Sequence, residues 1–178
     1  MEVRDADRDG ARRRAILDAA LACFLQFGFA KTSLDDIAKR ANLSRPLLYR
    51  KYKNKEDIFG AVYDDVFDAR YPRAKEALDG RGSKRDKLLR IYDLLVVETW
   101  ALVMDSPTAR EFYDACMRVI PEIHAKHEKR LYELTRALFD SKDTTHVFML
   151  SVDGLMGDLP SAATLHKRIA LLVERFLS

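Results

Sequence analysis

The sequence predicts an all-α fold of about nine helices, and three observations carry that prediction. Apolar residues recur at the three- and four-residue spacing of a helix in most segments. Runs in which apolar and polar residues alternate, as they do in a half-buried strand, are absent from the sequence. Capping signatures such as Ser83 followed by Asp86 stand before several of the apolar stripes.

The N-terminal third contains the first two predicted helices. Apolar residues over 16–25 form one stripe, and Gly28 follows as the C′ residue that ends this helix. Ser33 and Asp36 form a capping box that opens a short second helix. Asn42 lies in the turn after it, because asparagine tolerates the left-handed backbone conformation.

A further short helix follows this turn closely. Ser44 is its predicted N-cap, and Pro46 is acceptable in its first turn. Asn54 caps the next helix, with Asp57 at position N3 and an apolar stripe over 58–67. Two short helices joined by three or four turn residues form a helix-turn-helix, whose second helix fits the major groove of DNA.

The rest of the chain also has helical periodicity. Gly80 and Gly82 mark a loop, after which a long helix runs from Ser83 to about Met104 and is apolar on nearly all sides around Trp100. The later helices are expected from Ser106-Pro107 to Arg118, from Pro121 onward, from an Asp143 cap to Met156 before Gly157, and along the amphipathic tail.

Charge is unevenly distributed along the chain. Residues 1–55 hold 13 Lys and Arg against 7 Asp and Glu, whereas residues 56–178 hold 18 against 21. This asymmetry indicates a basic module for a polyanion, attached to a body with another role.

Length and composition exclude other classes of protein. The longest run without a charged residue, Ala19–Ala30, has 12 residues, whereas a bilayer span needs about 20. The N-terminal sequence lacks the apolar core of a signal peptide. Cys23 and Cys116 are the two cysteines, too few for a disulfide framework. We therefore expect a cytoplasmic, soluble protein.

At the helix-turn-helix the sequence resembles the tetracycline-repressor (TetR) family of bacterial transcriptional regulators. The matching residues are FGFAKTSLDDIAKRANLSRPLLYRKYKNKEDIF, preceded by ARRRAILDAALACF, and they cover about residues 11–67. The resemblance implies a three-helix DNA-binding domain, here 1–55, and a helical effector-binding and dimerisation domain, here 56–178. It also implies a homodimer that contacts its copy through the last two helices.

The resemblance places the predicted DNA contacts in and around the helix-turn-helix. Lys55 falls where the family binds a phosphate, and Leu47 stands in place of a frequent threonine, which changes the expected operator sequence. Asn42 replaces a usual glycine, and Tyr52 a usual phenylalanine. The predicted DNA-binding residues are Ser33, Ser44, Arg45, Pro46, Leu47, Tyr49, Arg50, Lys51 and Lys55. Arg12, Arg13 and Arg14 are either an additional arm toward DNA or a solvated helix start.

The body is expected to bind an effector and a second copy of the chain. An apolar cavity between helices is predicted to be lined by aromatic and sulfur-containing residues, namely Tyr92, Trp100, Met104, Phe112, Tyr113, Met117 and His127. The predicted dimer interface consists of Val147, Leu150, Gly154, Leu165, Ile169, Leu172 and Phe176.

Two other classes of function stay open at this point. His124 and His127, with Glu128 nearby, are the one metal-like cluster, and a metal-dependent hydrolase built on them is the enzymatic alternative. An architectural DNA binder without an effector is the other. We expect neither an enzyme, nor a bound metal, nor a cofactor. The sequence favours a repressor that a small, largely apolar effector releases from an inverted-repeat operator.

Overall fold

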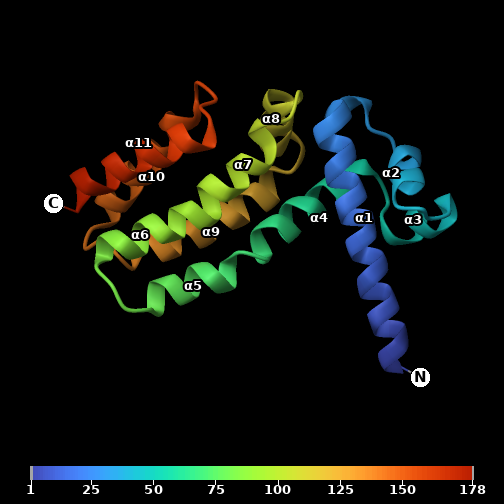
Figure 1. Ribbon diagram of the computed structural model, residues 1–178, viewed down its shortest axis with the longest axis horizontal. Coiled ribbons are helices and arrows are strands. Elements are labelled where there is room, and N and C mark those ends of the chain that lie inside the picture. Colours follow the sequence, from blue (N-terminus) through green and yellow to red (C-terminus); the bar gives the residue numbers. More distant parts are fainter. Residues whose placement is uncertain (1, 178) are drawn as a thin grey trace. The chain divides into compact units, whose positions relative to one another are not determined.

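The computed structural model describes residues 2–177, and the side chains of residues 8–177. Over these residues the chain is helical, with eleven α-helices, one π-helical stretch and no strand. The stretch η1 (Asp93–Val97) joins α6 (Lys84–Tyr92) to α7 (Glu98–Met104) without a break, and two residues separate α4 (Lys55–Asp68) from α5 (Tyr71–Asp79). Counting each of these runs as one helix gives nine helices in the described chain, which confirms the predicted all-α fold (Figure 1).

The described residues divide into two compact units. Unit 1 extends to Asp65 and includes Ser106–Ile123, and unit 2 comprises Val66–Asp105 and the residues from His124 onward. The functional boundary predicted at residue 55 stays a prediction. The helices not yet introduced are α1 (Glu2–Lys31), α2 (Leu34–Arg40), α3 (Arg45–Lys51), α8 (Ala109–Val119), α9 (Pro121–Arg136), α10 (Lys142–Met156) and α11 (Ala162–Phe176).

The core of unit 1 is an aromatic cluster between α1, α4 and α8. The Phe59 ring lies 5.0 Å from the rings of both Phe24 and Phe29, and 5.1 Å from that of Phe112, measured between centroids. All four side chains are buried. Edge-to-face ring pairs of this kind add to the hydrophobic free energy of the burial itself. The cluster therefore fixes α1 on α4, next to the helix-turn-helix.

Gly28 interrupts α1, close to the helix end predicted for it. Its φ of 82° lies in the left-handed region, where glycine is favoured. Beyond the kink, the backbone N–H of Ala30 donates to Oε1 of Glu111 in α8 at 2.8 Å. The hydroxyl of Thr108 donates to the carbonyls of Phe24 and Leu25. Residues from the 106–123 segment thus satisfy backbone groups that the kink leaves without helical partners.

Unit 2 packs α10 and α11 side by side, with α11 also against α6 (Figure 1). Phe148 is fully buried there, and its ring lies 5.1 Å from Tyr92 and 5.3 Å from both Phe139 and Phe176. The Tyr92 hydroxyl is hydrogen-bonded to Thr135 at 3.0 Å. This buried pair supplies the polar partner that a tyrosine in a core requires.

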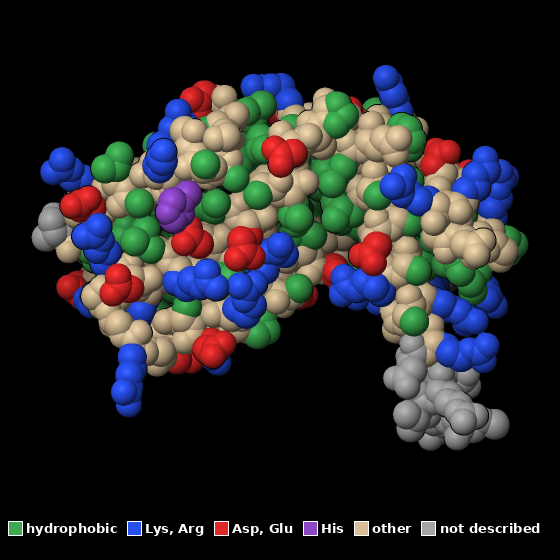
Figure 2. Space-filling model, in the orientation of Figure 1, with side chains coloured by type: hydrophobic (Ala, Val, Ile, Leu, Met, Phe, Trp, Pro, Cys, Tyr) green, Lys and Arg blue, Asp and Glu red, His purple; other side chains and the backbone are tan. Residues whose placement is uncertain are grey.

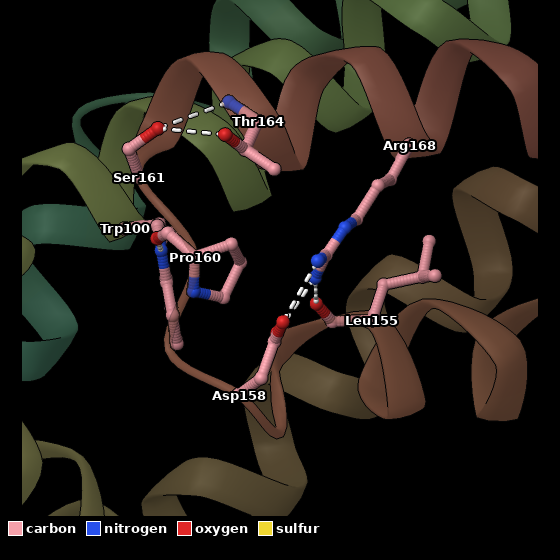
Figure 3. Close-up of polar contacts among 7 residues, drawn as sticks. All are labelled: Trp100, Leu155, Asp158, Pro160, Ser161, Thr164 and Arg168. Atoms are coloured by element: carbon pink, nitrogen blue, oxygen red, sulfur yellow. Dashed lines mark hydrogen bonds and ion pairs between the residues drawn. The ribbon is translucent and has the colours of Figure 1, made fainter.

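Hydrogen bonds from both sides fix the connection between α10 and α11. Trp100 Nε1 donates to the Pro160 carbonyl at 2.8 Å (Figure 3). Arg168 donates to both carboxylate oxygens of Asp158, at 2.6 and 2.7 Å, and to the Leu155 carbonyl at 2.9 Å. A two-pronged contact between arginine and a carboxylate restricts the geometry as well as contributing energy. The turn is therefore held to α7 and to α11.

Two predicted helix starts were wrong, each by a few residues. The helix expected from Ser106-Pro107 begins at Ala109 with Thr108 as N-cap, because Thr108 is held by its hydrogen bonds to α1. The α10 cap is Ser141 rather than Asp143: its hydroxyl accepts from the backbone N–H groups of Asp143 and Thr144. The Ser83–Asp86 capping box and the start at Pro121 are confirmed.

Candidate nucleic-acid interface

Helices α2 and α3 form the predicted helix-turn-helix. Ser33 and Asp36 make the reciprocal hydrogen bonds of a capping box, and the hydrogen bonds from Ser33 hold the pKa of the Asp36 carboxyl below its usual range. In the turn, Asn42 has a φ of 52°, the left-handed conformation expected for it. The Leu43 N–H then donates to the Ala38 carbonyl at 2.9 Å, which closes the turn. The sequence thus builds this motif from local interactions.

Helix α3 presents a polar face and buries one anchor. Leu48 is fully buried, whereas Arg45, Pro46, Tyr49 and Arg50 are exposed. The Tyr49 side chain is 53% exposed, which is high for a large aromatic residue. Leu47 and Lys51 are half-buried. The exposed residues are those predicted to contact DNA, and the buried one fixes α3 to unit 1.

The two predicted serines differ in what they already bind. The Ser33 hydroxyl caps α2 and also contacts Asp36 Oδ2 at 2.5 Å. Ser44 is the N-cap of α3 by position, yet its exposed hydroxyl makes no capping hydrogen bond within the described chain. Its carbonyl instead accepts from the N–H groups of Leu47 and Leu48. Of the two hydroxyls, that of Ser44 is the one available to an external acceptor.

Two cations of α3 are paired with acids of unit 1. Arg45 Nη2 lies 2.8 Å from Oδ2 of Asp35, in the first turn of α2. Lys51 Nζ lies 2.5 Å from Oδ1 of Asp9 in α1, and this hydrogen bond lowers the pKa of Asp9. The sequence analysis missed both acids, because spacing along the chain does not reveal a contact between helices.

Lys55 already has partners within the chain. Its ammonium donates to the Phe29 carbonyl at 2.7 Å and to the Ala30 carbonyl at 3.2 Å, and it lies 4.5 Å from the centroid of the Phe29 ring. Its positive charge therefore offsets the partial negative charge of carbonyls near the end of α1, a position where a cation is favoured. Asn54 caps α4 as predicted, accepting from the Asp57 N–H at 2.8 Å.

The arginines near the start of α1 are also engaged. Arg13 and Arg14 both bind the Asp65 carboxylate in α4, at 3.2 and 2.7 Å. These contacts fix α1 to α4, so the structure favours neither of the two predicted roles, DNA arm or solvated helix start, for this pair. Figure 2 shows further Lys and Arg side chains at the surface over α2 and α3, and the exposed ones include Lys39 and Arg40 in α2. Lys53, two residues after α3, is also exposed.

Comparison with known proteins agrees with this motif. The family model for bacterial regulatory proteins of the tetR family matches residues 16–62, which include α2, α3 and three of the four phenylalanines of the aromatic core, namely Phe24, Phe29 and Phe59. Over residues 16–62 the chain resembles the TetR family of regulators. It is 35% identical over 68 residues to the transcriptional regulator YhgD of Bacillus subtilis, covering 38% of this chain and 36% of YhgD. It is 31% identical over 91 residues to the transcriptional regulator TtgR of Pseudomonas putida, covering 48% and 43%. The chain therefore spans less than half the length of these curated relatives.

Solved structures extend the similarity of fold beyond the TetR-family motif. A TetR-family regulator from Mesorhizobium loti superposes with a TM-score of 0.69 at 20% identity, covering 96% of each chain. SmeT, the repressor of a Stenotrophomonas maltophilia multidrug efflux pump, does so with a TM-score of 0.68 at 20% identity, covering 93% of this chain and 88% of SmeT. The matched proteins are regulators rather than enzymes.

The residues predicted to line an effector cavity are divided between the two units. Phe112, Tyr113 and Met117 belong to unit 1, and Met117 is 51% exposed. Tyr92, Trp100, Met104 and His127 belong to unit 2. These unit 2 residues lie on α6, α7 and α9. The cavity itself stays a prediction.

His127 is buried within an aromatic stack of unit 2. Its ring lies 4.7 Å from that of Phe67 and 5.7 Å from that of Tyr71, and the Tyr71 hydroxyl donates to the His127 carbonyl at 3.0 Å. Arg130 Cζ lies over the Tyr71 ring, 3.4 Å from its centroid, and the Arg130 side chain forms an ion pair with Asp68. The stack holds the start of α5 on α9.

The two histidines of the metal alternative, His124 and His127, both lie in α9. Among residues 8–177, no group of three His, Cys, Asp or Glu residues is placed to hold a metal ion. Burial raises the pKa of the Cys116 thiol to about 12, which disfavours the thiolate, the reactive form of a cysteine. None of the described helices combines the length and the apolar character that a membrane span requires.

The predicted dimer residues fall on two different faces. Val147 and Leu150 in α10 are 53% and 62% exposed, and a Cβ at Gly154 would meet no atom of the described chain within 4 Å. Leu165 and Ile169 in α11, by contrast, are covered by the chain's own core. Leu172 and Phe176 are half-buried. On α11 the large apolar residue that is exposed is Leu171, which is not among the predicted interface residues.

Proposed function

We propose that this chain is a TetR-family DNA-binding transcriptional regulator, and specifically a repressor that works in the cytoplasm as a homodimer. The observation that carries the proposal is the exposed face of α3, where Arg45, Tyr49 and Arg50 are exposed beside a closed helix-turn-helix. A recognition helix needs this combination, since base edges and phosphates are contacted by side chains that the core does not occupy.

The side chains of α3 suit different parts of DNA. Arg45, at the first position of α3, is proposed to donate to guanine O6 and N7, while half-buried Leu47 contacts a thymine methyl group. Tyr49 and Lys51 are proposed to bind phosphates, together with Ser44 and the N–H groups at the start of α4. Lys55 is proposed to approach a phosphate only through its remaining N–H.

The proposed homodimer uses the exposed apolar residues of the last two helices. Val147, Leu150, Gly154 and Leu171 form this surface, and Leu165 and Ile169 are omitted from it because the chain itself covers them. A two-fold dimer places two recognition helices in symmetric positions, which calls for an inverted-repeat operator.

The effector is proposed to be small and largely apolar. Unit 2 supports this by its buried residues Tyr92, Trp100 and Phe148 and by the ring stack at His127. Release from DNA then requires the effector to bind one conformation of the dimer more tightly than the other.

DNA binding is tested by selection of duplexes from a pool with a randomised central segment, using the full chain. We expect an enriched inverted repeat, bound more tightly than a scrambled duplex. Lys51→Ala is expected to weaken binding to both duplexes alike and to flatten the salt dependence by about one phosphate contact. Arg45→Ala is expected to relax the preference at one base pair per half-site. Binding that is indifferent to sequence indicates an architectural DNA binder and contradicts the proposal.

A further inference from the structure

Both ends of α3 carry a cation that is already paired with an acid. Asp35 pairs with Arg45 at the first residue of the helix, and Asp9 pairs with Lys51 at the last. All four residues belong to unit 1. A carboxylate beside a phosphate-binding surface opposes DNA binding by like-charge repulsion, so each acid lowers the affinity that its partner provides.

Folding stability does not account for the Asp35–Arg45 pair. The two side chains are 34% and 60% exposed, and exposed ion pairs contribute little to stability. Asp35 also lies outside the capping box of α2, which Ser33 and Asp36 form. The pair acts instead on the direction of the guanidinium.

The geometry leaves the arginine free to bind a base. Asp35 contacts Nη2 of Arg45 at 2.8 Å. A guanidinium has five N–H donors in a rigid fork, so one carboxylate leaves donors for guanine O6 and N7. A phosphate that binds Arg45 must displace Asp35, whereas a guanine edge can bind Arg45 while the ion pair persists.

We propose that Asp35 is a specificity-determining positioning residue of the DNA interface: its carboxylate orients Arg45 toward a guanine edge and withholds it from DNA phosphates. This inference rests on the proposed function. The Lys51–Asp9 pair is the natural comparison. An ammonium is a point charge without a fork, so Asp9 reduces affinity but does not affect which base is read.

The experiment compares Asp35→Ala with Asp9→Ala on two duplexes, the enriched inverted repeat and its scrambled version, over a series of salt concentrations. Asp35→Ala is expected to bind the scrambled duplex more tightly and with a steeper salt dependence. It is also expected to lower the preference for guanine about tenfold at the base pair that Arg45 contacts. Asp9→Ala is expected to raise affinity for both duplexes by the same factor. Asp35→Asn, which keeps an acceptor for Nη2, is expected to retain most of the guanine preference.

Two outcomes overturn the inference, and they are distinguishable from failure of the proposed function. If Asp35→Ala changes the affinity for both duplexes by the same factor, as is expected for Asp9→Ala, Asp35 acts only as a counter-ion. If Arg45→Ala and the double variant Arg45→Ala with Asp35→Ala differ in guanine preference, Asp35 does not act through Arg45. Circular dichroism checks folding, and Asp35→Ser replaces the alanine variant if that one loses helix. A wild-type chain that selects no sequence overturns the proposed function first.

Discussion

The carboxylate of Glu111 occupies the space that a side chain at position 28 would need. A Cβ atom on Gly28 would overlap Glu111 Oε2, while Oε1 of the same carboxylate accepts the Ala30 N–H at 2.8 Å. The kink of α1 and the position of α8 are therefore coupled, because moving the carboxylate away breaks its hydrogen bond.

Gly28→Ala is expected to destabilise the protein by about 2 kcal/mol. The positive φ strains any residue with a Cβ, and displacing Glu111 removes a hydrogen bond. Urea denaturation followed by circular dichroism measures the change in free energy of unfolding. Gly10→Ala is the control: it lies in α1 with no atom of the described chain within 4 Å of its Cβ, and is expected to stabilise by about 0.5–1 kcal/mol. Equal effects of the two variants would contradict the coupling.

Lys55→Met is expected to lower stability by about 1 kcal/mol even without DNA. Methionine keeps an apolar contact with the Phe29 ring but cannot donate to the Phe29 and Ala30 carbonyls. The melting temperature measures this loss. Lys53→Met, whose side chain is exposed, serves as the control and is expected to melt with the wild-type protein. Unchanged melting of Lys55→Met would mean that the ammonium does not stabilise the end of α1.

Two acids of the α10 region are expected to affect stability in opposite directions with pH. Partial desolvation and the nearby Glu128 raise the pKa of Asp153, so its charged form is disfavoured in the folded state and stability falls as pH rises through that pKa. Asp153→Asn is therefore expected to raise the melting temperature at pH 7, with the gain vanishing below the unfolded pKa of about 4.

Asp158 gives the opposite sign. Its hydrogen bond with Arg168 lowers its pKa, so its stabilisation is present above the unfolded pKa and is lost as pH falls through the folded one. Asp158→Asn is expected to lower the melting temperature at pH 7 and to have little effect in acid. Changes of the same sign in both variants would contradict this account of the two environments.

Leu150→Glu is expected to dissociate the proposed homodimer. Burying a leucine contributes at least about 1.5 kcal/mol, and two-fold symmetry doubles the loss to about 3 kcal/mol, on the order of a hundredfold in Kd. Light scattering over a dilution series measures the mass. Lys142→Glu, a charge change at the first residue of the same helix, is expected to leave the dimer intact. A wild-type chain that is monomeric at micromolar concentration would refute the interface.

Local signals in the sequence were sufficient to predict most helices. The capping boxes of Ser33 and Ser83, the asparagine turn at Asn42 and the start at Pro121 depend on residues within one helical turn of each other. Thr108 was missed because its hydroxyl binds carbonyls more than eighty residues away in sequence.

The same limit applies to the sites. The position of α3 after the turn was sufficient to predict its exposed face from the sequence. The acids that pair with Arg45 and Lys51 could not be predicted in this way, because they come from other helices. In α11, periodicity correctly indicated an amphipathic helix. It could not tell which stripe the chain itself covers, so Leu165 was selected in place of Leu171.

The hydrogen bond between Trp100 and Pro160 has a practical consequence for spectroscopy. Trp100 is the sole tryptophan of the sequence, and its buried indole is tied to the turn between α10 and α11. Intrinsic fluorescence therefore reports on unit 2, whereas the helical circular dichroism signal sums over both units. Coincident transitions of the two signals would indicate that the units unfold as one cooperative system, and separated transitions would indicate that each melts by itself.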